Sequence, residues 1–107
     1  MNRGEIWWVT FDRSVGGEVQ KGRPAIIVSN DASNRHLNRV QVVPITSRVE
    51  RIYPSESPVV VGKRVGKAMA DQLTTVSKTR LLRIVGRASL SEMRALERAM
   101  KVQLALT

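Results

Sequence analysis

The sequence predicts a mainly β fold that ends in one α-helix. Two observations carry this prediction: short aliphatic and β-branched runs alternate with polar segments up to residue 88, and apolar residues then recur at helical spacing. Because the runs are short and closely spaced, they favour a small β-barrel or sandwich over a βαβ fold. The 107 residues have the length of one domain, so residues 1–107 are expected to fold as a single unit.

Six runs have the composition of β-strands. The first, EIWWVTF, would turn Trp7 and Trp8 to opposite faces, one towards a core or interface and the other available to stack on a base. Pro24 begins the second run, which is apolar enough to be buried on both faces, and Pro44 predicts an edge position or bulge near the end of the third. The predicted strands are residues 5–11, 23–29, 39–45, 59–61, 66–71 and 81–88.

Polar segments separate these runs. Residues 12–22 form a glycine-rich, charged loop, and residues 30–38 are polar with room for a short helical turn. Residues 46–58 contain two prolines and predict a second long loop, and residues 74–80 predict a turn.

The last segment has the pattern of an amphipathic helix. Ser89 and Glu92 have the spacing of a capping box, which starts the helix. Glu97 and Lys101 are placed as an i,i+4 ion pair. The apolar stripe, which is expected to pack on the core, consists of Leu90, Met93, Leu96, Met100 and Leu104.

The charge balance predicts a polyanionic partner. Eighteen Lys and Arg against nine Asp and Glu give a net charge of +9, and most of the cations are Arg, which binds phosphate through two parallel hydrogen bonds. Nucleic acid is the first hypothesis; an acidic protein, anionic lipid or plain solubility are the alternatives. The cations in residues 63–87 are interpreted as a phosphate-binding face or as an ordinary solvated face.

Other residue types exclude several mechanisms. The chain has no Cys, so disulfides, thiolate metal sites and Cys nucleophiles are excluded. Its one histidine, His36, excludes a His pair and a multi-His metal cage within one chain, and is interpreted as a surface loop residue. No apolar run is long enough for a membrane span or a signal peptide, so a cytoplasmic location and no membrane partner are expected.

Two loop–strand junctions carry candidate chemistry. Arg23 stands at the start of an apolar strand after a glycine-rich loop, and Thr46, Ser47 and Arg48 follow the end of another strand. A solvated strand-end Arg and a plain turn are the structural alternatives. Glu18, in the first loop, is either a general base or a solvated carboxylate.

Four segments, in order, resemble the MazF/PemK family of toxin endoribonucleases. They are residues 3–8 (RGEIWW), 22–31 (GRPAIIVSND), 42–47 (VVPITS) and 71–81 (DQLTTVSKTRL), so the resemblance covers nearly the whole chain. It implies an SH3-like small β-barrel with a C-terminal helix, working as a homodimer. It also implies the toxin of a type II toxin–antitoxin system, inhibited by an acidic antitoxin similar to MazE.

The resemblance further implies sequence-specific, metal-independent cleavage of single-stranded RNA, with no cofactor. The family's catalytic Arg and Thr fall on Arg23 and Thr46, and Glu18 is a further candidate. Two departures, Gly17 and Val19, replace a Ser and a Gln of the family and suggest an altered cut-site preference. RNA contacts are expected from Arg13, Gly17, Lys21, Ser47, Arg48 and Gln72.

The implied chemistry is attack by the ribose 2′-OH, which leaves a 2′,3′-cyclic phosphate and a 5′-OH. Arg23 would stabilise the charged transition state and Thr46 would donate a neutral hydrogen bond. Two other functions remain open: a gyrase poison that resembles CcdB, and a plain nucleic-acid-binding barrel.

Overall fold

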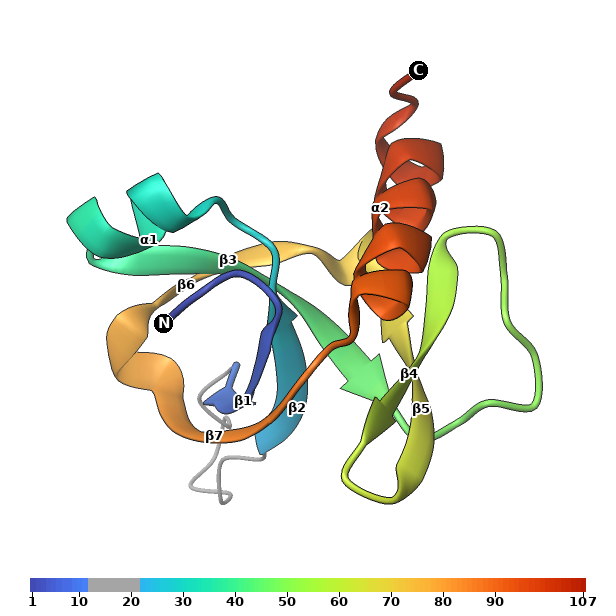
Figure 1. The fold of residues 1–107 in the computed structure, drawn as a ribbon, viewed down its shortest axis with the longest axis horizontal. Coiled ribbons are helices and arrows are strands. Elements are labelled where there is room, and N and C mark those ends of the chain that lie inside the picture. Colours follow the sequence, from blue (N-terminus) through green and yellow to red (C-terminus); the bar gives the residue numbers. More distant parts are fainter. Residues whose placement is uncertain (12–21) are drawn as a thin grey trace, which may run out of the picture.

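The computed structural model describes residues 1–11 and 22–107 (Figure 1). In these residues one antiparallel sheet has the strand order β4-β5-β3-β2-β1-β7, and β6 pairs with β3 off this path. The strands are β1 (Glu5–Thr10), β2 (Gly22–Ile27), β3 (Arg39–Thr46), β4 (Glu56–Val61), β5 (Arg64–Met69), β6 (Thr74–Ser77) and β7 (Leu81–Arg87). The helices are α1 (Asp31–His36) and α2 (Leu90–Leu104), with 3-10 turns at Ala70–Gln72 and Lys78–Arg80.

The predicted fold class, mainly β with a C-terminal helix, is confirmed. The sheet curls into half of a small barrel, and α2 lies across its open side against β4 and the Ala70–Gln72 turn (Figure 1). Among the residues that the structure describes, no helix is long and apolar enough to cross a membrane.

The prediction that Pro44 marks a sheet edge or a bulge is wrong, because the register of β2 and β3 runs through Pro44 without a shift. Pro44 pairs with Ala25 in β2 and is buried within β3, the central strand. The other side of β3 pairs first with β6, through Val42, and then with β5, from Ile45 onwards. Pro44 falls in the step between these two partners, where the ladder needs no N–H donor.

Two strand predictions also differ from the structure. The segment predicted as a turn at residues 74–80 contains β6, which pairs with the first half of β3. β4 begins at Glu56, three residues earlier than predicted, so the preceding loop is shorter. Both segments are polar, and their strand conformation comes from pairing with distant strands rather than from their own composition.

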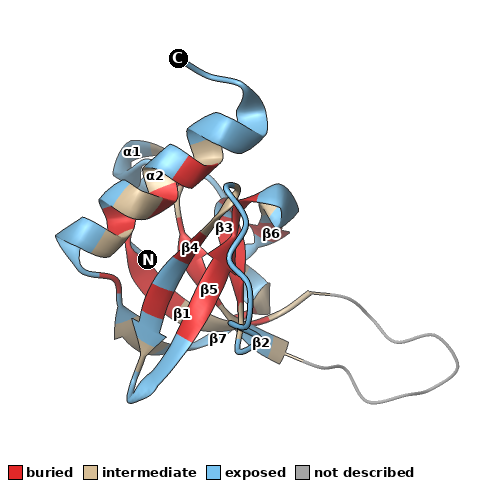
Figure 2. Ribbon diagram, turned by 90° about the vertical axis from the view of Figure 1, so that its right-hand side faces the viewer, coloured by how far each residue is buried: buried red, intermediate tan, exposed pale blue. Residues whose placement is uncertain are grey.

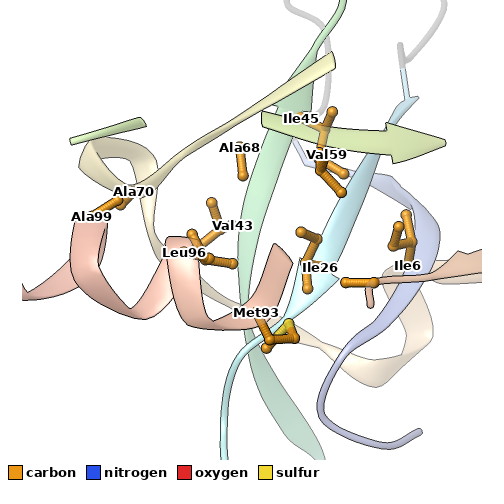
Figure 3. Packing of buried hydrophobic residues seen from close by; sticks show 11 residues of the cluster. Ile6, Ile26, Val43, Ile45, Val59, Ala68, Ala70, Met93, Leu96 and Ala99 are labelled. Carbon is orange, nitrogen blue, oxygen red and sulfur yellow. The ribbon is translucent and has the colours of Figure 1, made fainter. Parts of the chain in front are cut away.

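The strands bury both of their faces in the middle of the sheet (Figure 2). Ile26 points into a core that α2 covers, whereas its neighbours Ala25 and Ile27 belong to a second cluster on the opposite face. This confirms burial on both faces for residues 25–27, whereas Arg23, at the start of the predicted run, is exposed. The core under α2 includes Ile6, Ile26, Val43, Ile45, Val59, Ala68, Met93 and Leu96 (Figure 3).

The predicted capping box of α2 is confirmed. The Ser89 hydroxyl accepts from the Glu92 N–H at 3.1 Å, and the Glu92 carboxylate accepts from the Ser89 N–H at 2.8 Å. The other Glu92 oxygen accepts from the N–H of Val60 at 2.7 Å, which ties the helix start to β4. The Glu92 carboxylate therefore accepts hydrogen bonds from the backbone N–H of the helix cap and from the backbone N–H of a strand.

The predicted apolar stripe is only partly buried. Met93, Leu96 and Ala99 are buried, but Leu90 and Leu104 are 68% and 51% exposed. Leu104 is exposed because the last turns of α2 project beyond the sheet (Figure 1), whereas Leu90 is exposed at the first residue of the helix. The predicted partner of Glu97 also differs from the observed one. Glu97 was expected to pair with Lys101, but its carboxylate accepts a hydrogen bond from Arg3 at 3.1 Å, which joins the N-terminus to α2.

Leu96 and Leu104 give a matched test of this packing. Leu96→Ala is expected to lower the free energy of unfolding by about 2–5 kcal/mol, because Leu96 is fully buried. Leu104→Ala should change it by less than about 1 kcal/mol. Urea unfolding followed by far-UV circular dichroism measures both, and equal losses would contradict this placement of α2.

Candidate functional site

A groove of about 430 Å³ lies where the start of β2, the end of β3 and the β4–β5 hairpin meet. Apolar and glycine residues make most of its surface, and two Arg and two hydroxyl side chains are the polar groups. The lining residues are Trp8, Gly22, Arg23, Pro24, Ile45, Thr46, Ser47, Val61, Arg64, Val65 and Gly66.

The antiparallel register brings the two predicted catalytic side chains into this groove. Ala25 of β2 pairs with Pro44 of β3, so continuing the register by two residues sets Arg23 level with Thr46. Both residues line the groove, with Arg23 exposed and Thr46 half-buried. A guanidinium and a hydroxyl in one groove can contact the same phosphate.

Two glycines let the walls of the groove approach one another. A Cβ on Gly22 would collide with the indole Nε1 of Trp8. A Cβ on Gly66 would lie 2.8 Å from the Thr46 carbonyl oxygen and 2.9 Å from Ile45 Cγ2. Gly66 thus allows β5 to pack directly against the strand end that carries Thr46.

The Thr46 hydroxyl is held by the turn that follows it. Its Oγ1 accepts from the N–H of Arg48 at 3.3 Å, which leaves the hydroxyl proton available for donation. Ser47 lines the groove and is exposed. Arg48 is also exposed but is not among the lining residues.

Gln72 is not among the residues that line the groove. Gln72 is exposed on the Ala70–Gln72 turn and donates to the Met69 sulfur at 3.5 Å. Arg13, Gly17, Glu18 and Lys21 lie outside the described residues. His36 is exposed at the end of α1, as predicted for a surface residue. Within residues 1–11 and 22–107, no three His, Cys, Asp or Glu side chains gather as a metal site.

Three residues line the groove that the sequence motifs do not assign to it, namely Val61, Arg64 and Val65. All three lie on the β4–β5 hairpin, whose tight turn has Gly62 at φ +64°. The position of this hairpin against β2 cannot be predicted from local sequence, because it depends on β5 pairing with the end of β3.

The prediction that Trp7 and Trp8 face opposite sides is confirmed. Trp7 packs against the second core cluster, and its Nε1 donates to the Glu5 carboxylate at 3.0 Å. Trp8 lines the groove instead, and the Arg83 guanidinium lies 5.2 Å from its ring centre. Trp7 therefore belongs to the packing of the core, whereas Trp8 lies on the groove.

The cations of residues 63–87 do not form one phosphate-binding face. Lys67 is buried and donates to the Arg51 carbonyl oxygen and the Glu56 carboxylate. Arg80 donates to the carbonyl oxygens of Thr10 and Phe11. Arg87 pairs with Glu5. Lys67, Arg80 and Arg87 therefore bind groups of the protein itself, and Arg64 is the member of the group that lines the groove.

Lys67 and Glu56 anchor the loop that follows Thr46. The Lys67 ammonium lies 2.8 Å from the Glu56 carboxylate and 2.7 Å from the Arg51 carbonyl oxygen. Burial raises the pKa of Glu56, but hydrogen bonds from Lys67 and the Tyr53 N–H outweigh it and hold the pKa below its ordinary value. A lowered carboxyl pKa adds stability above the ordinary pKa and loses it as the pH falls through the lowered one.

Glu56→Gln is therefore expected to destabilise the protein by about 1–3 kcal/mol at pH 7 and by much less near pH 3. Denaturant unfolding of wild type and variant at both pH values measures the difference. Glu50→Gln, an exposed carboxylate of the same loop, is the control and should show little effect. A loss that is the same at both pH values would contradict the ionic role of Glu56.

Comparison with known proteins gives one consistent result. The family model for PemK-like, MazF-like toxins of type II toxin–antitoxin systems matches residues 2–104. The endoribonuclease MazF9 of Mycobacterium tuberculosis is 40% identical over 115 aligned positions, which span 99% of this chain and 98% of that protein.

Comparison with solved structures gives toxins of the same fold. An endoribonuclease from a mycobacterial species, solved in complex with its cognate antitoxin, superposes with a TM-score of 0.83 at 26% identity over 100% of this chain and 97% of that one. The MazE–MazF complex of Deinococcus radiodurans gives a TM-score of 0.86 at 24% identity over 100% and 97%, which shows the same fold. Because the family model covers residues 2–104 and MazF9 aligns over nearly the whole chain, this chain belongs to the family of PemK-like and MazF-like toxins of type II toxin–antitoxin systems.

Proposed function

We propose that this protein is a sequence-specific, metal-independent endoribonuclease that cleaves single-stranded RNA and acts as the toxin of its toxin–antitoxin pair. The observation that carries the proposal is that Arg23 and Thr46, far apart in sequence, line the same groove. The name of the relative MazF9, an endoribonuclease aligned over nearly the whole chain, supports the same activity. We also propose that residues 1–107 form one toxin domain.

The proposed reaction is an attack by the ribose 2′-OH on the adjacent phosphate. Arg23 carries a permanent charge and binds the phosphate oxygens as negative charge builds up on them. Thr46 donates its hydroxyl proton in a hydrogen bond to the same group. Glu18 is the proposed group that polarises the 2′-OH. As the bond from the 2′-oxygen to phosphorus forms, the bond from phosphorus to the 5′-oxygen breaks. The 2′-OH gives up its proton towards Glu18, and the leaving 5′-oxygen takes a proton from water. The products are a 2′,3′-cyclic phosphate and a 5′-OH, and no protein nucleophile is required.

We propose that the RNA lies between residues 16–22 and residues 46–56, near the interface of a homodimer. Ser47 supplies a further hydroxyl within the groove. Gly17 and Val19 shift the preferred cut site relative to other family members. Further RNA contacts are proposed for Arg13, Gly17, Lys21, Arg48 and Gln72.

The proposed protein partner is an acidic antitoxin that resembles MazE and docks on the basic groove. The mycobacterial neighbour was solved with its own antitoxin, which supports such a partner. The net charge of +9 favours an acidic protein for the same electrostatic reason that it favours RNA. The cytoplasm, where mRNA is present, is the proposed site of action.

Incubation of the purified protein with RNA in excess EDTA tests the proposal. Discrete RNA fragments are the expected result. Intact RNA together with inhibited DNA supercoiling would show a gyrase poison instead. Salt-dependent retention of uncut RNA would show a plain nucleic-acid-binding barrel.

A further inference from the structure

We propose that the groove contains a nucleobase subsite in which Trp8 forms the aromatic wall and Arg64 holds a neighbouring phosphate. The subsite adjoins Arg23 and Thr46, and its occupant is one base of a single-stranded RNA. This inference rests on the proposed function for its substrate class.

The lining of the groove suits an apolar, aromatic ligand. Trp8 and Pro24 line it from β1 and β2, while Val61 and Val65 line it from the β4–β5 hairpin. Ile45 adds apolar surface from the end of β3. Val65 is 56% exposed, so an apolar side chain stands in contact with water at the groove. A base that packs against these side chains would remove that surface from water.

The charges of the groove suit the backbone of the same ligand. Arg23 comes from β2 and Arg64 from β5, and both side chains are exposed. Neither forms an ion pair with any carboxylate in the described part of the chain. Two guanidinium groups beside an apolar groove can bind successive phosphates while the base between them enters it.

The position of Trp8 is set by its neighbours, which favours a binding role. Pro24 and Arg83 flank it in register on β2 and β7, and the Arg83 guanidinium lies over the ring. Gly22, which has no side chain, leaves room for the Nε1 edge. The indole is therefore held before a ligand arrives, and less conformational freedom is lost on binding.

Tryptophan fluorescence tests the base subsite, because Trp7 and Trp8 are the chain's two tryptophans. Trp7→Phe leaves Trp8 as the reporter, and Trp8→Phe leaves Trp7. The probes are homopolymeric 2′-deoxy decamers, which lack the attacking 2′-OH, and an abasic decamer with the same backbone. Should Trp7→Phe fail to fold, the difference in quenching between wild type and Trp8→Phe gives the Trp8 signal.

The decamers with bases are expected to quench the Trp8 reporter, whereas the abasic decamer should not. The Trp7 reporter should stay unquenched. Trp8→Phe should still bind the decamers, but with lower affinity than wild type. Trp8→Ala, which removes the aromatic wall, should weaken binding by about 10-fold or more. Equal quenching of the two reporters, or quenching by the abasic decamer, would overturn the proposal.

Salt dependence tests the role of Arg64. Arg64→Ala should reduce the slope of log K against log salt by about 0.7, the value for one phosphate contact on a single strand. Arg94→Ala, an exposed cation of α2, is the matched control and should leave the slope unchanged. An unchanged slope in Arg64→Ala would contradict the phosphate contact.

RNA cleavage by wild type, measured separately, distinguishes the two proposals. Cleaved RNA without quenching of the Trp8 reporter would reject the subsite and leave the proposed function standing. Quenching with uncut RNA would reject the nuclease and leave a base-binding groove.

Discussion

Arg23→Ala is expected to lower the rate of RNA cleavage by about 1,000-fold while the fold stays intact. The rate should fall because a guanidinium that binds the phosphate in the transition state is lost. The fold should persist because Arg23 is exposed at the start of β2 and pairs only through its backbone with Val9. Single-turnover cleavage of RNA and the thermal midpoint measure the two effects.

Arg23→Lys separates charge from geometry. Lysine keeps the positive charge but lacks the planar fork, so an intermediate rate is expected. Arg94→Ala controls for net charge and should cleave at the wild-type rate. If Arg23→Ala cleaves RNA as fast as wild type, the assignment of the site to this groove is wrong.

Thr46→Val is expected to lower cleavage by about 100-fold, with little change in folding. Valine has nearly the shape of threonine but cannot donate a hydrogen bond, and the loss of one such donor costs about 100- to 1,000-fold in rate. The hydrogen bond that Thr46 Oγ1 accepts from Arg48 is also lost, at about 1 kcal/mol of stability. The rate at saturating RNA measures the first effect and denaturant unfolding the second.

Two substitutions control this result. Thr46→Ser retains the hydroxyl and should recover most of the rate. Ser47→Ala removes the neighbouring hydroxyl of the groove and should have a smaller effect. A Thr46→Val protein with unchanged rate at saturating RNA would exclude Thr46 from the chemistry.

Local signals in the sequence predicted much of the fold. The capping box at Ser89 and Glu92 placed the start of α2 correctly, because it depends on residues three apart. Apolar runs placed β1, β2 and β3, and alternation placed Trp7 and Trp8 on opposite faces. These features depend on residues close in sequence, because side chains alternate along a strand and the cap joins residues three apart.

Features that depend on distant partners were not predictable in this way. The burial of Pro44 follows from the step between β6 and β5, and the burial of Lys67 follows from the loop that returns to Glu56. The groove itself forms only when the β4–β5 hairpin meets β2. Arg23 and Thr46 were paired by resemblance to the family, and the register of β2 and β3 provides the physical reason that they share a groove.

The chemical nature of the RNA ends tests the central claim most directly. RNA cleaved by the wild-type protein in EDTA can be probed with polynucleotide kinase and by mass spectrometry of the fragments. Cleavage by the 2′-OH predicts a 2′,3′-cyclic phosphate on one fragment and a 5′-OH on the other. A 5′-phosphate with a free 3′-OH would contradict the proposed mechanism.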